Sequence, residues 1–191
     1  MTIAGIILAG GKSSRFGKPK MFETYKGKYF YEYSVDACKE NSLSPLVIAT
    51  NQNLIPDFKR DDEVEFIIEK ETEIHLGPLF AMYHAMNSIE ADWYFILSCD
   101  IPFVTSDFVS YMISLAEGSS YDAIVPIQAE KIHPLLALYH RRSLPKMQQI
   151  LSQDIKKIRV FLDEIDVLKV PFPEDNVVFV NINRQEDMLH L

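Results

Sequence analysis

The sequence predicts an α/β fold in which helices cover both faces of a mostly parallel central sheet. Short, strongly apolar runs alternate along the 191 residues with segments whose apolar positions repeat every three to four residues. Several of the runs are apolar throughout, which is typical of strands that are buried on both faces. No linker-like Gly/Ser or Pro tract and no internal repeat divides the chain. Residues 1–191 are therefore expected to form a single three-layer α/β/α domain.

Eight segments have the length and composition of strands. They are residues 3–8, 45–50, 65–68, 93–98, 122–127, 135–139, 167–170 and 177–181. Strand–helix alternation requires right-handed crossovers, and sheets built in this way bind ligands at the carboxyl ends of their strands. The residues that directly follow the strands, among them Asn51, are therefore the first candidates for a binding site.

Two of the intervening helices carry clear signals. Positions 109, 112, 113 and 116 are apolar and lie on one helix face, and Ser106 before them is the predicted N-cap. Positions 79, 82, 83 and 86 have the same spacing after Gly77 and Pro78. Proline suits the first turn of a helix, so a helix is predicted to begin there.

Composition and charge limit the kind of ligand. The formal net charge is -8 at pH 7, so general nucleic-acid binding, which relies on basic residues that neutralise phosphates, is not expected. No apolar run approaches the ~20 residues that cross a bilayer, and the N-terminus lacks the basic start of a signal peptide. We therefore expect a cytoplasmic protein without a membrane partner. Cys38 and Cys99 are too far apart for CxxC chemistry and are expected to be free thiols.

A glycine-rich turn directly after the first predicted strand is the exception to this acidity. The segment IILAGGKSSRFGKPK places Gly10 and Gly11 at the strand end and four cations between Lys12 and Lys20. Adjacent glycines let backbone N–H groups approach a ligand closely, and Arg and Lys add charge-assisted contacts to phosphate oxygens. The P-loop and GxGxxG patterns are excluded, because both require Gly where Lys12 stands. A surface turn with solubilising lysines is the alternative to a different kind of triphosphate loop.

The segment LAGGKSSRFGKPK resembles the signature LAGGxSxRMGxxK of the nucleotidyltransferase family that contains the molybdenum cofactor guanylyltransferases, with Phe16 in place of Met. The resemblance implies a Rossmann-like nucleotidyltransferase fold of the GT-A-like kind. It also implies that Arg15 and Lys20 bind the phosphates and act in catalysis. The candidate nucleotide-binding residues are Leu8, Ala9, Gly10, Gly11, Ser13, Lys20, Asn51, Glu69 and Asp100, of which the first three contact guanine and ribose through their backbone.

The segment ILSCDIPFV delivers a carboxylate, Asp100, just beyond a buried strand. A hard oxygen ligand at this place suits Mg²⁺ that bridges phosphates, and an Asp that begins a turn before Pro102 is the ordinary alternative. The pattern formed by Asp100, Pro102 and Phe103 resembles the DxPF metal-binding motif of the family. The resemblance implies that Asp100 binds Mg²⁺ and is a catalytic residue.

Three further segments resemble family motifs on the substrate side. The first, HLGPLFAMYHAM, is similar to the GPLAG segment, with Ala81 in place of Gly. The second, IHPLLALY, is similar to the HPL segment that lines the pterin side. The third, FVNINRQEDM, is similar to the NINTPED segment. The implied pterin contacts are Gly77, Pro78, His133, Asn181 and Asn183. From the residues alone, a histidine near a strand is more often a structural group, and the asparagines could form a turn or cap a helix near Gln185.

One position departs from the family where guanine or ribose is read. Many relatives have an acidic residue at the position of Lys70, which here is flanked by Glu69 and Glu71. Either neighbouring carboxylate could replace it, or the guanine could be bound through backbone groups alone. Glu71 could equally lie in a solvated charged loop.

The motifs extend from Leu8 to about Asp187 and imply an enzyme that transfers GMP from GTP to molybdenum-molybdopterin. The products would be molybdopterin guanine dinucleotide and pyrophosphate, with Mg²⁺ as cofactor and cofactor-assembly proteins or apo-molybdoenzymes as protein partners. The alternatives are a molybdopterin cytidylyltransferase or another small-phosphate nucleotidyltransferase. Gly11 counts against the cytidylyltransferase, which resembles LAAG. A non-catalytic nucleotide-binding module is the alternative of another class, although it would not need a metal-binding carboxylate.

Overall fold

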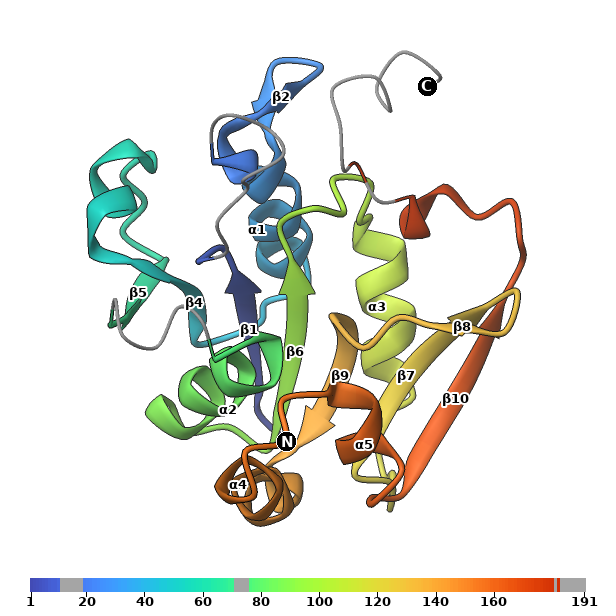
Figure 1. Ribbon diagram of the computed structural model, residues 1–191. Coiled ribbons are helices and arrows are strands. Elements are labelled where there is room, and N and C mark those ends of the chain that lie inside the picture. Colours follow the sequence, from blue (N-terminus) through green and yellow to red (C-terminus); the bar gives the residue numbers. More distant parts are fainter. Residues whose placement is uncertain (11–18, 71–75, 181, 183–191) are drawn as a thin grey trace.

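A computed structural model describes residues 1–10, 19–70, 76–180 and 182, which form a central sheet with helices on both faces (Figure 1). The strands of the main sheet are β1 (Ile3–Leu8), β4 (Leu46–Asn51), β5 (Glu65–Glu69), β6 (Trp93–Ser98), β7 (Ala123–Gln128), β8 (Lys131–Ile132), β9 (Leu136–His140) and β10 (Val167–Phe172). The helices are α1 (Phe30–Glu40), α2 (Pro78–Ser88), α3 (Ser106–Ser114), α4 (Leu144–Ser152) and α5 (Ile158–Leu162). In those ranges no helix is long and apolar enough to cross a membrane.

The sheet is mostly parallel, as predicted. Its strand order is β10-β7-β9-β6-β1-β4-β5, with β8 paired to β7, while β2 (Thr24–Tyr25) and β3 (Lys28–Tyr29) form a separate hairpin. The pairs β6–β1, β1–β4, β4–β5 and β10–β7 are parallel, whereas β9 is antiparallel to both of its neighbours. The carboxyl ends of β5, β4, β1 and β6 therefore lie along one edge of the sheet.

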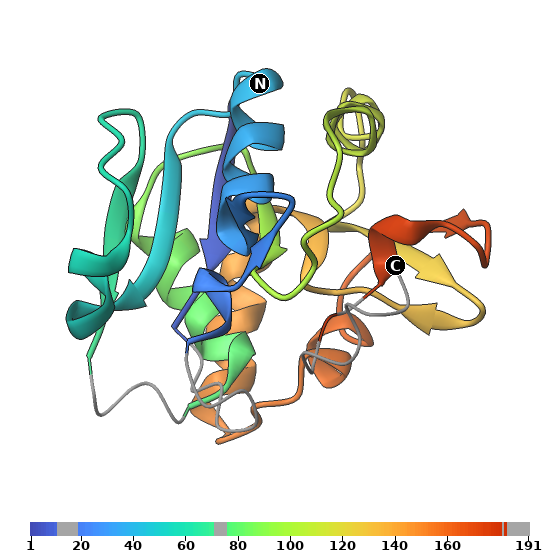
Figure 2. The same ribbon diagram turned by 90° about the horizontal axis from the view of Figure 1, so that it is seen from above.

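The sheet is buried between two helical layers (Figure 2). Successive residues of β1 point to opposite faces: Ile7 belongs to the core that contains side chains of α1 and α3, and Ile6 to the core that contains side chains of α2, α4 and α5. Both side chains are fully buried. This double burial explains why the strand is apolar throughout instead of alternating.

Seven of the eight predicted strands are present, with bounds that differ by at most two residues, but the strand predicted at 177–181 is wrong. Residues Val177–Phe179 form a short 3-10 helix, η4, and residue 181 lies outside the described residues. The side chain of Asn176 accepts a hydrogen bond from the Val178 N–H at 3.0 Å, which favours a turn over an extended strand. The apolar side chains of this run are buried by packing, with the ring of Phe179 5.7 Å from that of Phe108.

The helix starts show one confirmed prediction and one correction. Pro78 occupies the first turn of α2, as predicted. The N-cap of α3 is Thr105 and not the predicted Ser106, because the Thr105 hydroxyl accepts the Phe108 N–H at 3.2 Å. Ser106 is the first helical residue, and its Oγ accepts a hydrogen bond from Asn41 Nδ2 at 3.0 Å.

Thr105→Ala is expected to lower the free energy of unfolding by about 1 kcal/mol, the typical contribution of an N-cap side chain. The reason is that the Phe108 N–H loses its acceptor at the start of α3. Urea denaturation measures the change, and Ser110→Ala, at an exposed position of the same helix, is the control. Equal stability of Thr105→Ala and the wild type would show that the cap contributes nothing.

Candidate active site

Those predicted nucleotide-binding residues that the structure describes meet at the carboxyl edge of the sheet. Leu8 at the end of β1 is paired with Ala49 of β4 on one side and with Ser98 of β6 on the other. Asn51 and Glu69, the last residues of β4 and β5, are paired with each other. The structure thus brings the ends of four strands, with their predicted site residues, to one edge.

The backbone at the start of the opening loop is held firmly by the neighbouring strand. The Ala9 N–H donates to the Ala49 carbonyl at 2.8 Å, and the Thr50 hydroxyl donates to the Ala9 carbonyl at 2.9 Å. Cys99 N–H donates to the Leu8 carbonyl at 3.3 Å. The Ala9 N–H is already hydrogen-bonded to β4, and its carbonyl accepts one hydrogen bond from Thr50. Only the second lone pair of this carbonyl therefore remains for a ligand.

Gly10 lies directly against the carboxylate of Glu69. A Cβ atom built on Gly10 would lie 2.2 Å from Glu69 Oε2 and 2.8 Å from its Cδ. The Glu69 side chain is buried, with the residue only 8% exposed. A buried carboxylate therefore packs directly on the start of the opening loop, a contact between residues 59 positions apart that sequence motifs did not indicate.

Asp100 and Lys20 form an ion pair at the same edge. Lys20 Nζ lies 3.5 Å from Asp100 Oδ2, and Lys20 belongs to the short 3-10 helix η1 (Lys20–Phe22). The Lys20 residue is 8% exposed, whereas 27% of the Asp100 side chain is accessible. The Ser98 hydroxyl donates to Asp100 Oδ1 at 2.5 Å and so fixes the carboxylate. Two predicted catalytic residues are thus in contact, in a position where the carboxylate can be reached from solvent.

Ser98 is a site residue that the sequence analysis missed. Its signal is a polar side chain at the end of the otherwise apolar strand β6, two positions before Asp100. At this spacing the hydroxyl reaches the carboxylate across a tight turn. Ser98 is a positioning residue, because it acts through Asp100.

The residues present fit a divalent metal that is shared with phosphates. Among the described residues no three His, Cys, Asp or Glu side chains are grouped for a metal ion, and Asp100 is the candidate carboxylate ligand. Mg²⁺ is commonly bound by one or two carboxylates together with substrate phosphates and water. Ser98 donates a hydrogen bond to Oδ1, and Oδ2 faces the Lys20 ammonium group, so an ion at Oδ2 would compete with Lys20.

Cys99 is not a nucleophile at this site. Burial, together with the adjacent Asp100 carboxylate, raises the pKa of the Cys99 thiol to about 12. The thiol is therefore protonated at neutral pH, and only a thiolate reacts efficiently. Cys99 and Cys38 are free, as predicted.

The start of α2 lies beside a basic loop. Gly77 is the N-cap and has a φ of +88°, a conformation that favours glycine. A Cβ on Gly77 would be 3.7 Å from the Cβ of Lys156. In the chain α2 follows β5 and precedes β6, and these two strands run in the same direction in the sheet. The N-terminus of α2 therefore lies at the carboxyl edge, as Asp100 does.

His133 is buried and packs against the ring of Phe179. It is 7% exposed, its ring centroid lies 4.5 Å from that of Phe179, and its Nε2 has no hydrogen-bond partner among the described residues. Burial, aided by the charge of Lys131, lowers the pKa of His133 to about 4. The imidazole is therefore neutral at pH 7 and offers one unused nitrogen.

The stability of the protein should depend on pH through His133. Because the pKa falls from 6.5 when unfolded to about 4 when folded, the unfolded chain binds the proton more tightly. Stability is thus complete above pH 6.5 and is lost as the pH falls toward 4, by about 1–2 kcal/mol between pH 7 and pH 5. Urea denaturation at both pH values should show a smaller decrease for His133→Gln than for the wild type. An equal decrease would contradict the assigned role of His133.

Five predicted site residues lie outside the described residues. They are Gly11, Ser13, Arg15, Asn181 and Asn183. The adjacent Ile182 is described, and its N–H donates to the Asp100 carbonyl at 3.1 Å. This contact anchors the chain between Asn181 and Asn183 at the carboxyl end of β6.

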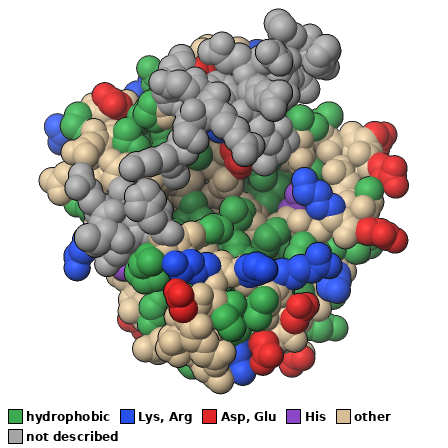
Figure 3. All heavy atoms as spheres, viewed as in Figure 1, with side chains coloured by type: hydrophobic (Ala, Val, Ile, Leu, Met, Phe, Trp, Pro, Cys, Tyr) green, Lys and Arg blue, Asp and Glu red, His purple; other side chains and the backbone are tan. Residues whose placement is uncertain are grey.

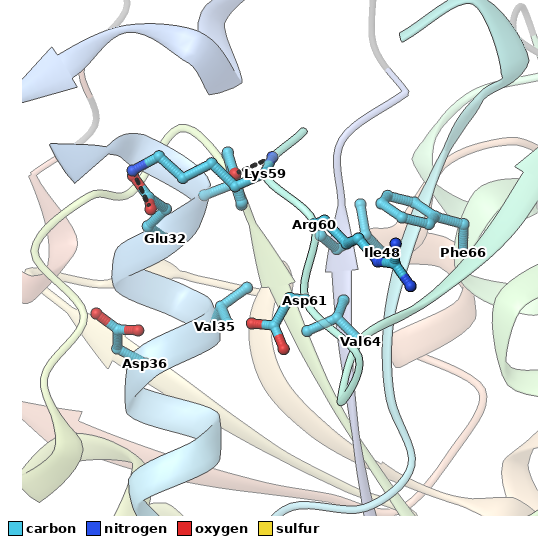
Figure 4. Close-up of a pocket in the computed structure, with 10 residues that line it drawn as sticks. Glu32, Val35, Asp36, Ile48, Lys59, Arg60, Asp61, Val64 and Phe66 are labelled. Carbon is cyan, nitrogen blue, oxygen red and sulfur yellow. Dashed lines mark hydrogen bonds and ion pairs between the residues drawn. The ribbon is translucent and has the colours of Figure 1, made fainter. Parts of the chain in front are cut away.

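A pocket on the face of the sheet that α1 covers is separate from the carboxyl edge (Figure 4). It lies between α1, β4, β5 and the loop before β5, with Val35, Ile48 and Phe66 among its apolar lining residues. Lys59 at its rim is paired with Glu32 at 2.6 Å. The charges around this pocket are thus neutralised by each other.

Comparison with known proteins agrees with this geometry. A family model described as the MobA-like NTP transferase domain matches residues 5–168. The chain belongs to this family. It is 35% identical to a probable molybdenum cofactor guanylyltransferase of Halalkalibacterium halodurans, over 96% of this chain and 94% of the relative. A second protein of that name, from a Geobacillus species, is 32% identical over 95% and 93%. The sequence-based prediction of a MobA-like nucleotidyltransferase is confirmed.

Solved structures show the same fold. The molybdopterin-guanine dinucleotide biosynthesis protein A of Archaeoglobus fulgidus superimposes with a TM-score of 0.77 over 100% of this chain and 96% of that chain, at 22% identity. A Mycobacterium tuberculosis protein in complex with manganese has a TM-score of 0.73 over 100% and 98%, at 13% identity. These likenesses confirm the predicted nucleotidyltransferase fold of this MobA-like chain.

Proposed function

We propose that this MobA-like nucleotidyltransferase transfers GMP from GTP to the phosphate of molybdenum-loaded molybdopterin. The products are molybdopterin guanine dinucleotide and pyrophosphate. The names of the relatives support the cofactor and the base, and the contact between Lys20 and Asp100 beside the opening loop is the observation on which the chemistry depends. We place the reaction in the cytoplasm, where free thiols such as Cys38 stay reduced.

The reaction forms one P–O bond and breaks another. A phosphate oxygen of the acceptor attacks the α-phosphorus of GTP, and the bond from that phosphorus to the bridging oxygen of the β-phosphate breaks, so that pyrophosphate leaves. Catalysis of this kind depends on positioning and on electrostatic stabilisation rather than on a protein nucleophile. The neutral thiol of Cys99 agrees with that requirement.

Lys20 stabilises the negative charge that accumulates on the phosphates. Its ammonium group is on a buried side chain at the end of the opening loop, where solvent screens a charge less than at the surface. In the absence of nucleotide it is balanced by Asp100. Arg15, which lies outside the described residues, is proposed from its motif to share this role.

Asp100 would hold Mg²⁺, with Ser98 fixing the orientation of the carboxylate. When bound, the ion neutralises phosphate charge at the reacting centre. The manganese complex of the M. tuberculosis protein supports a divalent ion in this fold. Lys20 and the ion would both be attracted to Asp100, so nucleotide phosphates that attract Lys20 would make Oδ2 available.

Glu69 is the proposed group that reads the base or the ribose. Its carboxylate is buried against Gly10, whereas the neighbouring Lys70 is exposed. Guanine carries N–H donors at N1 and N2 that a carboxylate accepts, whereas cytosine presents no such pair. The backbone of Leu8 and Gly10, with Asn51 at the end of β4, would complete the nucleotide side.

The acceptor is proposed to contact the start of α2 and the segment around His133. Gly77 and Pro78 at the start of α2 and the unpartnered nitrogen of His133 are the described candidates for pterin contacts. Asn181 and Asn183 belong to the same proposal through the anchored residue between them. Proteins that deliver the pterin or receive the finished cofactor are the proposed partners.

Pyrophosphate release with molybdopterin and GTP, CTP or ATP in separate reactions tests the choice of base. Release with GTP alone would support the guanylyltransferase and the role of Glu69. Release with CTP alone would assign the sister cytidylyltransferase activity. No release with any nucleotide, despite tight nucleotide binding, would favour a non-catalytic binding module.

A further inference from the structure

Four cations that have no ion-pair partner among the described residues occupy one part of the surface. They are Lys131 on β8, Lys157 before α5, Arg159 on α5 and Lys169 on β10, and we refer to them as the basic row. All four are exposed, and within the described part of the chain no carboxylate lies within 4 Å of any of their charged groups. Asp163 lines a pocket together with Arg159 and Lys169 but forms no ion pair with either of them.

Cations elsewhere on the described surface are mostly paired. The paired ones include Lys28, Lys39, Lys59, Arg60, Arg141, Arg142, Lys146 and Lys156. With a formal net charge of -8, the chain has more than enough carboxylates to balance its cations. A cluster of unbalanced positive charge on such a protein attracts anions locally.

The basic row borders the candidate active site. Arg159 and Lys169 line one pocket with Ile132, the neighbour of Lys131 on β8. Lys157 follows Lys156, which packs against Gly77 at the start of α2. Figure 3 shows a row of Lys and Arg side chains over the α4–α5 connection and α5, along one side of a central hollow.

The other border of the row is the segment around His133. Lys131 lies close enough to His133 for its charge to help lower the pKa of the imidazole. His133 packs on Phe179 of η4, and η4 leads to Ile182, which is hydrogen-bonded to Asp100. The row thus extends from α2 to the segment that contacts Asp100, next to the described residues that are proposed to bind the acceptor.

We propose that the basic row binds the anionic acceptor, a pterin that carries a phosphate and a molybdenum dithiolene group. This assignment rests on the proposed function, in which the acceptor is molybdopterin. The triphosphate of GTP already has Lys20 and, from its motif, the cations of the opening loop, so a second group of cations serves a second anion. Arg and Lys in the row hold the acceptor while its phosphate faces the α-phosphorus.

A charge-matched pair of triple variants tests this assignment. Lys157→Gln/Arg159→Gln/Lys169→Gln removes three charges from the row. The control Lys26→Gln/Lys59→Gln/Arg60→Gln removes three exposed charges elsewhere, one in the turn between β2 and β3 and two beside the pocket of Figure 4. We expect the row variant to raise the KM for molybdopterin roughly tenfold, with kcat and the KM for GTP changed by less than about twofold. The control should leave all three values close to those of the wild type. Equal melting temperatures of the variants would exclude misfolding.

Equilibrium dialysis of molybdopterin without nucleotide tests the acceptor assignment of the basic row separately from the proposed function. If the wild type binds molybdopterin and the row variant binds it about tenfold more weakly, the assignment is supported. If the wild type is active but the row variant equals the control, or if its KM for GTP rises instead, the acceptor assignment is wrong while the proposed function stands. If the wild type neither binds molybdopterin nor releases pyrophosphate with it, the proposed function fails and the assignment fails with it.

Discussion

Asp100→Asn is expected to lower kcat by about 10³-fold or more, because the variant loses the proposed carboxylate ligand of Mg²⁺ at the reacting centre. The amide keeps the shape of the side chain and can still accept the hydrogen bond from Ser98. The side chain is partly exposed, so no large loss of stability is expected. Pyrophosphate release at saturating GTP and molybdopterin measures kcat, and thermal melting measures stability.

Asp107→Asn is the matched control for this variant. Asp107 is an exposed residue in the first turn of α3, seven positions along the chain from Asp100. We expect its kcat to stay within about twofold of the wild type, since surface charges away from the site contribute little. Normal turnover of Asp100→Asn would overturn the metal assignment, and equal losses in both variants would indicate a general electrostatic effect.

Gly10→Ala is expected to decrease kcat/KM for GTP by more than about tenfold and to lower the unfolding free energy by about 1–3 kcal/mol. The added methyl group would overlap the buried carboxylate of Glu69, which would have to shift. Displacement of this carboxylate would also disturb the proposed contact with guanine. Steady-state kinetics with GTP and urea denaturation give the two effects separately.

A double-mutant cycle identifies the cause of this effect. In Gly10→Ala/Glu69→Ala the overlapping carboxylate is absent, so much of the stability lost in Gly10→Ala should return. Activity should not return, since Glu69 is the proposed base-reading group. If Glu69→Ala changes the stability by the same amount with glycine and with alanine at position 10, the steric account is wrong.

The strands could be predicted from the sequence because their apolar runs reflect burial on both faces. Residues 3–8 and 93–98 have the predicted bounds, and both strands are central in the sheet. The run at 177–181 was misassigned because it is buried by aromatic packing, with Asn176 stabilising a turn. An apolar run records burial but does not specify whether a strand or a turn is buried.

Motifs located the site residues but not the contacts between them. The ion pair of Lys20 with Asp100 joins residues 80 positions apart, and the packing of Glu69 on Gly10 depends on strands from two parts of the sheet. The basic row could not be predicted from the sequence either, because its members come from β8, α5, β10 and the segment before α5. Only the fold brings such residues together.

Product analysis with GTP labelled at the α-phosphate tests the central claim most directly. Purified protein is incubated with the labelled GTP, molybdenum-loaded molybdopterin and Mg²⁺, and the products are separated and weighed by mass spectrometry. The account predicts that the label enters molybdopterin guanine dinucleotide, with one pyrophosphate released per dinucleotide formed. Label that stays in GTP, or appears in free GMP or GDP without dinucleotide, would contradict it.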